Sequence, residues 1–218
     1  MKTLTFTEKG PRRRNEDRLG ILGLEDGACF AVLSDGMGGH ECGDEAAQVV
    51  VDRMLKEWID SDVPPCESKI SEIIKRVGFA YEQNARGREM GATLVAAYAC
   101  EDTAIFAHCG DIRIYLASQD LSVKYRTTDH SRVSFGWHLV DNAFFTGRCH
   151  NIRPEMSRHT VAAGYRIMLC SDGVSGFISE DEIWKLLATG TLDDACSALM
   201  DACARSSRDN YSAIIIEI

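Results

Sequence analysis

The sequence is short of basic residues and contains no long apolar run and no CxxC pair. Lysine and arginine number 24 against 33 aspartates and glutamates, which gives a formal net charge of −9. This balance argues against nucleic-acid binding, because contact with a phosphate backbone needs a basic face. No apolar run reaches the roughly 20 residues of a membrane-spanning helix, so we expect no membrane-embedded form. The missing CxxC pair argues against a structural zinc site.

Disulfide bonds are not expected either, although the chain has nine cysteines. Their number is odd, their spacing is irregular, and the first residues, MKTLTFTEKG, contain no apolar signal core. We therefore predict reduced thiols and a cytoplasmic protein. Cys109 precedes Arg113, as in the phosphate loop of cysteine-dependent phosphatases, but only three residues intervene. Because so short a loop cannot wrap a phosphate with its amides, we predict that Cys109 is a small buried apolar residue, like most of the other cysteines.

The length of 218 residues, with 45% apolar and 26% charged residues, predicts one globular domain over 1–218. Periodicity and turn residues predict strands at 3–7, 18–22 and 28–34, followed by helices at 44–58 and 70–81. They then predict an antiparallel meander of 93–100, 103–108 and 112–117 and a hairpin of 161–163 with 166–170. Towards the end of the sequence they predict one helix that begins at Ser179, a second helix at 192–203 and a strand at 211–218. This irregular order disfavours a doubly wound parallel sheet. It favours an α+β fold in which helices flank two antiparallel sheets.

Acidic residues stand beside glycine or asparagine just outside several of these apolar runs. A strand end can direct such a carboxylate into a shared cleft. The candidates are Glu16, Asp35, Asp172 and Asp209, with the carbonyl of Gly36 as a further oxygen donor. Oxygen donors of this kind suit hard divalent cations, and a pair of such cations can activate water and neutralise a phosphoryl group. The pattern predicts a metal site that hydrolyses phosphate esters.

These motifs, in this order, resemble those of the metal-dependent serine/threonine protein phosphatases, also called type 2C. The similar stretches cover nearly the whole chain and are 10–17 (GPRRRNED), 35–39 (DGMGG), 91–93 (GAT), 110–113 (GDIR), 171–174 (SDGV) and 209–212 (DNYS). The resemblance implies a four-layer α-β-β-α sandwich, with two central antiparallel sheets flanked by antiparallel helix pairs. It also implies direct hydrolysis of phosphoserine and phosphothreonine by a bridging hydroxide at a binuclear Mn²⁺ or Mg²⁺ centre.

The resemblance also assigns roles to individual residues. Asp35 would bridge two metal ions and so be catalytic. Asp172 and Asp209 would complete the coordination of one ion, and Glu16 and the Gly36 carbonyl would hold the other. Arg12 stands at the motif position of the family's catalytic, phosphate-binding arginine, whose planar guanidinium suits a phosphoryl group. Asp111, together with Asp172, matches a weaker third metal site of bacterial members.

Several positions depart from the family pattern. Gly176 stands where many members have another aspartate, which weakens the third site, and Met37 replaces the histidine of some eukaryotic members. His40 is interpreted as a polar neighbour of the site. The flap region at about 129–159 is shorter than usual, so it does not identify a substrate.

The partners implied are phosphoserine and phosphothreonine proteins, together with a partner serine/threonine kinase and its substrates. We expect a monomer of bacterial type. Two other functions stay open from the sequence. One is a pseudophosphatase that binds phosphoproteins as a regulatory module, and the other is a hydrolase of small phosphate esters, which a short flap would admit.

Overall fold

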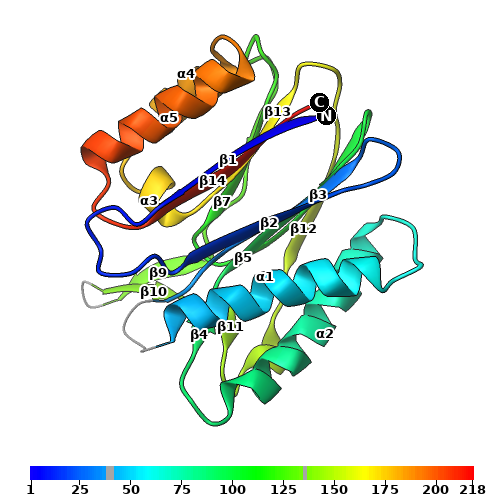
Figure 1. Ribbon diagram of the computed structural model, residues 1–218, viewed down its shortest axis with the longest axis vertical. Coiled ribbons are helices and arrows are strands. Elements are labelled where there is room, and N and C mark those ends of the chain that lie inside the picture. Colours follow the sequence, from blue (N-terminus) through cyan, green and yellow to red (C-terminus); the bar gives the residue numbers. More distant parts are fainter. Residues whose placement is uncertain (38–41, 135–136) are drawn as a thin grey trace.

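Two five-stranded antiparallel sheets form the centre of the molecule, and a pair of helices covers the outer face of each (Figure 1). The computed structural model describes residues 1–37, 42–134 and 137–218. The four-layer α-β-β-α sandwich predicted from the sequence is therefore confirmed. Among the described residues, no helix has the length and apolar character needed to cross a membrane.

The first sheet has the order β12-β6-β5-β3-β2. Its strands are β2 (Asp17–Gly23), β3 (Cys29–Asp35), β5 (Leu94–Ala99), β6 (Thr103–Cys109) and β12 (Glu155–Thr160). Helices α1 (Gly43–Ile59) and α2 (Glu67–Ala85) pack on it. The predicted apolar stripes of both helices are buried, as the 3.6-residue period requires.

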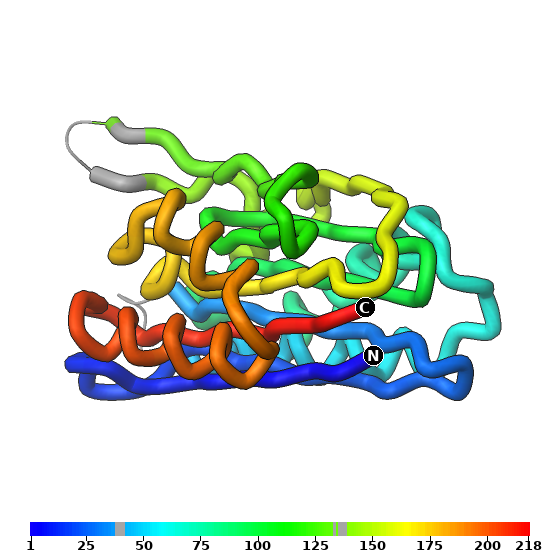
Figure 2. The backbone as a smooth tube through the Cα atoms, turned by 90° about the horizontal axis from the view of Figure 1, so that it is seen from above, coloured from blue at the N-terminus to red at the C-terminus, as the bar shows by residue number. Residues whose placement is uncertain are grey.

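The second sheet has the order β1-β14-β13-β7-β8. Its strands are β1 (Lys2–Glu8), β7 (Arg113–Ala117), β8 (Lys124–Arg126), β13 (Arg166–Cys170) and β14 (Tyr211–Glu217). Helices α4 (Glu180–Ala188) and α5 (Leu192–Ser206) cover it, and the short α3 (Asp172–Ser175) follows β13. Because β1 pairs antiparallel with β14 along its whole length, the two chain ends lie close together (Figure 2).

Smaller elements fill the region that the sequence assigned to a short flap. They are a hairpin of β9 (Ser131–Ser134) and β10 (Trp137–Val140), the two-residue β11 (Phe144–Phe145), which pairs with β4 (Gly91–Ala92), and the 3-10 helix η1 (Cys149–Asn151).

The core consists of three apolar layers, one under each helix pair and one between the sheets. Strand β14 shows how the central sheets are buried on both sides. Ile215 packs toward the helices of its sheet, whereas Ile214 and Ile216 pack toward the other sheet. The prediction that the last strand is buried on both faces is therefore confirmed. All nine cysteines are free thiols, and five of them, Cys109 included, are buried.

Two strand pairings expected from the sequence are wrong. The segments 103–108 and 112–117 do not form a hairpin, because the chain crosses from one sheet to the other at Gly110, whose φ of 120° suits glycine. Strand β13 likewise pairs with β14 and β7 and not with 161–163. A short turn between two apolar runs looks the same in sequence whether the strands pair or face each other across the core.

Candidate metal centre

Asp35 closes β3, and its backbone is held by Thr93. The Asp35 amide donates to Thr93 Oγ1 at 3.0 Å, and the Thr93 amide donates to the Asp35 carbonyl at 2.9 Å. Burial raises the pKa of the partly buried Asp35 carboxyl well above its usual range, and the negative charges of Asp17, Asp172 and Asp111 raise it further. Asp35 is thus the meeting point of several carboxyl groups.

Asp172 approaches Asp35 from the other sheet. It is the first residue of α3, directly after β13, and its carboxyl group interacts with that of Asp35. Burial, followed by the charges of Asp111 and Asp209, raises the pKa of Asp172 to about 7. Two carboxyl groups brought together where the two sheets meet form a site that a cation would neutralise.

Asp17 belongs to the same cluster, although the sequence analysis did not propose it. It pairs with Asp35 across β2 and β3 and is only 2% exposed. Among the described residues, neither of its carboxylate oxygens has a hydrogen-bond partner of normal geometry. Burial raises its pKa to about 6, and the neighbouring Ser212 and Ser171 hydroxyls offset this only in part. The sequence did not single it out, because its place opposite Asp35 on the same face follows only from the register of β2 and β3.

Glu16 is positioned by Asn210. The Asn210 Oδ1 accepts from the Glu16 amide at 2.9 Å, and its Nδ2 donates to the carbonyls of Lys9 at 2.7 Å and Arg14 at 2.8 Å. One buried amide side chain therefore holds the loop that carries Glu16. Burial and then the charge of Asp44 raise the pKa of Glu16.

Gly36 lies between this loop and the start of α1. Its amide donates to the Glu16 carbonyl at 3.2 Å, and a Cβ at Gly36 would lie 2.0 Å from the Gly43 carbonyl oxygen. A Cβ at Gly43 would in turn lie 2.8 Å from the Glu16 carboxyl carbon. Both positions need glycine because backbone and carboxylate approach here more closely than a side chain allows.

Arg12 and Asp209 form an ion pair at the edge of the cluster. The Arg12 side chain is 54% exposed, so its guanidinium faces solvent as well as the carboxylates. Asp111, in the crossing between β6 and β7, adds negative charge to both Asp35 and Asp172. All six side chains named from the sequence therefore converge, together with the Gly36 backbone. Met37 donates its amide to the Gly91 carbonyl at 3.0 Å, whereas His40 lies outside the described residues.

A histidine pair lies beside Gly110 and was not proposed from the sequence. In the described part of the chain, His108, His130 and Glu155 are the trio of possible ligands whose donor atoms all lie within 4.8 Å of one another. The His130 Nδ1 accepts from Asn142 Nδ2 at 3.2 Å and from the Gly110 amide at 3.4 Å. The proton therefore resides on Nε2, which faces Glu155 Oε2 at 3.3 Å. A metal ligand at His130 Nε2 would need the proton on Nδ1 instead. We therefore interpret these hydrogen bonds as a structural link between the elements and not as a metal site.

A four-layer sandwich whose two sheets bring acidic side chains together at one end is the architecture of the type 2C phosphatases. The chain belongs to this family: residues 12–207 match the family model described as Protein phosphatase 2C.

Individual relatives agree with this assignment. A putative protein phosphatase 2C-type of Streptococcus pyogenes is 28% identical over 99% of this chain and 97% of its own length. The crystal structure of the serine/threonine phosphatase Stp1 from Staphylococcus aureus superimposes with a TM-score of 0.81 at 27% identity, over 100% of this chain and 94% of that one. The catalytic domain of the phosphatase PstP, solved in complex with two manganese ions, has the same fold, with a TM-score of 0.82 at 24% identity over 99% and 97% of the two chains.

Proposed function

We propose that this chain removes phosphate from phosphoserine and phosphothreonine in proteins, at a centre that holds two divalent cations, Mn²⁺ or Mg²⁺. Residues 1–218 would form one catalytic domain. The observation that carries the proposal is the convergence of Asp17, Asp35, Asp172 and Asp111: besides burial, the charges of Asp17 and Asp111 raise the pKa of both Asp35 and Asp172. Membership of the protein phosphatase 2C family supports the same activity.

The donor set fits hard divalent cations. The converging side chains are carboxylates, and the Gly36 carbonyl adds a neutral oxygen, which are the ligand types of Mg²⁺ and Mn²⁺. Without cations, burial and the neighbouring negative charges raise the pKa of Asp35 and Asp172, and the buried Asp17 carboxylate has no hydrogen-bond partner of normal geometry in the described structure. Positive charge in the cluster would relieve both unfavourable features.

The positions suggest a division of roles. Asp35 would bridge the two cations, because it lies between the Glu16 loop and Asp172. Asp172 and Asp209 would hold one cation, Glu16 and the Gly36 carbonyl the other, and Asp111 with Asp172 a weaker third. Cations bound there would lower the pKa of water in the site and neutralise the phosphoryl oxygens.

Arg12 would bind the phosphoryl group of the substrate. It is the one arginine seen in an ion pair with a candidate metal ligand in the described structure, and much of its guanidinium is exposed. Its present partner, Asp209, would turn to the cation when the site is loaded. The freed planar fork can then take two phosphoryl oxygens at once. Phosphoproteins and a kinase that phosphorylates them are the partners that follow; the cytoplasmic location and the monomeric state stay predictions.

Phosphate release from a phosphothreonine peptide tests the proposal. We expect release with Mn²⁺ that stops with chelator and falls at least 100-fold in Asp35→Asn, because the bridging carboxylate is lost. Asp26→Asn, in an exposed turn, is the matched control and should keep full activity.

Comparison with a small aryl phosphate under the same conditions separates the two alternatives. Release from the aryl phosphate but not from the phosphopeptide would favour a hydrolase of small esters. Absence of release from both substrates with either metal would contradict the proposal and favour a phosphoprotein-binding module.

A further inference from the structure

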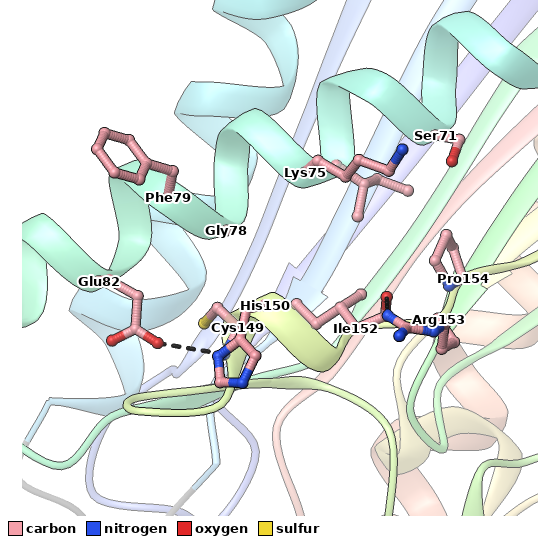
Figure 3. Close-up of a pocket in the computed structure, with 11 residues that line it drawn as sticks. Ser71, Lys75, Gly78, Phe79, Glu82, Cys149, His150, Ile152, Arg153 and Pro154 are labelled. Atoms are coloured by element: carbon pink, nitrogen blue, oxygen red, sulfur yellow. Dashed lines mark hydrogen bonds between the residues drawn. The ribbon is translucent and has the colours of Figure 1, made fainter.

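A groove of about 640 Å³ separates α2 from the segment that runs from η1 to the start of β12 (Figure 3). Its volume lies in the range of pockets that bind ligands or anchor side chains. The groove shares no lining residue with the candidate metal centre. It is therefore a separate feature of the surface, for which the proposed phosphatase activity gives no reason.

The floor of the groove is apolar, and a glycine of α2 lets η1 pack against the helix there. Ile74 and Cys149 are buried, and Ile152 is partly buried beside them. A Cβ at Gly78 would lie 3.3 Å from the Cys149 carbonyl oxygen, so glycine allows η1 to pack against the helix. Glycine inside a helix is less stable than alanine at the same position. The packing of η1 at this position offsets that cost and shapes the groove.

The rim of the groove carries an exposed aromatic ring. Phe79 projects from α2 with 70% of its surface exposed, the highest value among the exposed large apolar residues of the described chain (Figure 3). An exposed aromatic side chain next to an apolar hollow is typical of a protein interface.

The charged groups around the groove are mainly basic, in contrast to the acidic chain as a whole. Lys75, His150 and Arg153 line it; the Lys75 side chain is 72% exposed and its Nζ lies 3.8 Å from the Glu72 carboxylate on the same helix. Glu82 is the one acidic residue that lines it among the described residues, and its carboxylate already accepts from the amides of Gly147 at 2.9 Å and Cys149 at 3.1 Å. Because the contact of Lys75 with Glu72 is long and Glu82 is occupied by two amides, the lining presents more positive than negative charge on a molecule whose net charge is −9.

We propose that this groove binds a short acidic segment of a partner protein, with a bulky apolar side chain of the segment seated on the floor beside Phe79. The carboxylates of the segment would pair with Lys75 and Arg153 on the rim. Charge complementarity favours such a partner, because Lys75 and Arg153 would repel a basic segment and attract carboxylates.

Hydrogen bonds connect the groove to the candidate metal centre. Asn142 Nδ2 donates to the Arg153 carbonyl at 2.7 Å and to His130 Nδ1 at 3.2 Å, and Asn142 Oδ1 accepts from the Arg153 amide. The His130 amide donates to the Gly110 carbonyl at 2.7 Å. A segment bound at Arg153 would thus contact a backbone that leads to the residue preceding Asp111.

A peptide selection tests the proposal directly. A random 12-residue display library is selected on the full chain, with the Phe79→Ala/Lys75→Glu variant for counter-selection. We expect enrichment of peptides that combine Asp or Glu with Phe, Leu, Trp or Met. A fluorescein-labelled selected peptide should bind at least 10-fold more weakly to Phe79→Ala, Lys75→Glu and Arg153→Glu, and more weakly at high salt for all chains.

Matched controls separate the groove from general surface effects. Ile59→Ala removes an apolar side chain that is 66% exposed on α1, and Lys185→Glu reverses an exposed charge on α4; both should bind the peptide like the unchanged chain. Hydrolysis of an aryl phosphate by Phe79→Ala should also be unchanged. The proposal for the groove and the proposal for the activity are therefore tested independently.

Three results would overturn the proposal. They are an absence of enriched peptides, enrichment of peptides without acidic residues, and equal binding by Phe79→Ala. Self-association of the chain that Phe79→Ala abolishes, seen in sedimentation, would assign the groove to a second copy of this chain instead.

Discussion

Asn210 shows how one side chain can organise the loop that bears a functional residue. Its amide bonds the backbone of Lys9, Arg14 and Glu16, and the Asn210 side chain is buried. The asparagine follows Asp209 directly, so one short stretch supplies both a candidate ligand and the support of another. We infer that the DN pair acts as a unit.

Substitution of Asn210 by alanine should therefore cost more than one ordinary hydrogen bond. Three bonds at about 0.5–1.5 kcal/mol each give an expected loss of about 1.5–4.5 kcal/mol in the free energy of unfolding, measured in urea. Mn²⁺ affinity should also fall, because the Glu16 loop is released. Asn84→Ala removes one bond to the Ala80 carbonyl and is the control. Equal losses in the two variants would contradict this account of the loop.

The candidate residues differ in how the sequence revealed them. Asp35, Asp172 and Asp209 stand beside glycine or asparagine next to a strand, which is a signal that local sequence carries. Asp17 lacks that signal, because it is the first residue of β2 and is identified only by its cross-strand partner Asp35. The roles of these residues as metal ligands stay predictions.

At the scale of elements, Arg166 joins the second sheet to its helices. It is 2% exposed, pairs with Glu217, and donates to the carbonyls of Leu187, Thr189 and Gly190 where α4 ends and α5 begins. A buried guanidinium that caps free helix carbonyls replaces the water that would otherwise solvate them.

Arg166→Met should destabilise the chain by about 3–5 kcal/mol, because it leaves the Glu217 carboxylate and three carbonyls without their donor. Denaturant unfolding followed by circular dichroism measures the loss. Arg158→Met breaks a pair with Glu67 that lies on the surface, and should leave the free energy of unfolding nearly unchanged. If Arg166→Met is as mild as Arg158→Met, the link between β13 and α4 is not important for stability.

The helices and strands were predictable where the side-chain period was clear. All four long helices and the last strand follow the apolar pattern of the sequence. The capping box of Thr191 and Asp194 at the start of α5 was not proposed, whereas the Ser179 cap at α4 is present. The membership of β7 and β13 in a sheet could not be predicted, because hydrogen-bonding partners are set by crossings such as the one at Gly110.

For the whole molecule, the acidic cluster predicts an unusual dependence of stability on pH. In the folded, metal-free chain Asp17 has a pKa of about 6 and Asp172 of about 7, whereas in the unfolded chain both release their protons near 3.8. Between these values the folded state binds more protons than the unfolded state, so its stability falls as pH rises. With chelator present, we expect the free energy of unfolding to decrease from pH 5 to pH 8.

Two changes should weaken this fall in stability with rising pH. The first is Asp35→Asn, which removes one negative charge from the cluster. The second is Mn²⁺, which replaces the bound protons, so the rise in melting temperature on adding Mn²⁺ should be larger at pH 8 than at pH 5.5. Thermal melts with chelator or Mn²⁺ at both pH values measure the effect. A metal-free chain that becomes more stable between pH 5 and pH 8 would contradict the assigned cluster.

The sequence by itself determined the class of fold, the helices, the doubly buried last strand and the set of residues that converge, because these depend on local period and on short motifs. The tertiary structure alone decided that Asp17 joins Asp35, that Asn210 holds the Glu16 loop, that β6 and β7 belong to different sheets, and that a basic groove lies beside α2. Each of these depends on residues far apart in the chain meeting across a sheet or between layers. Spacing along the sequence carries no information about such meetings.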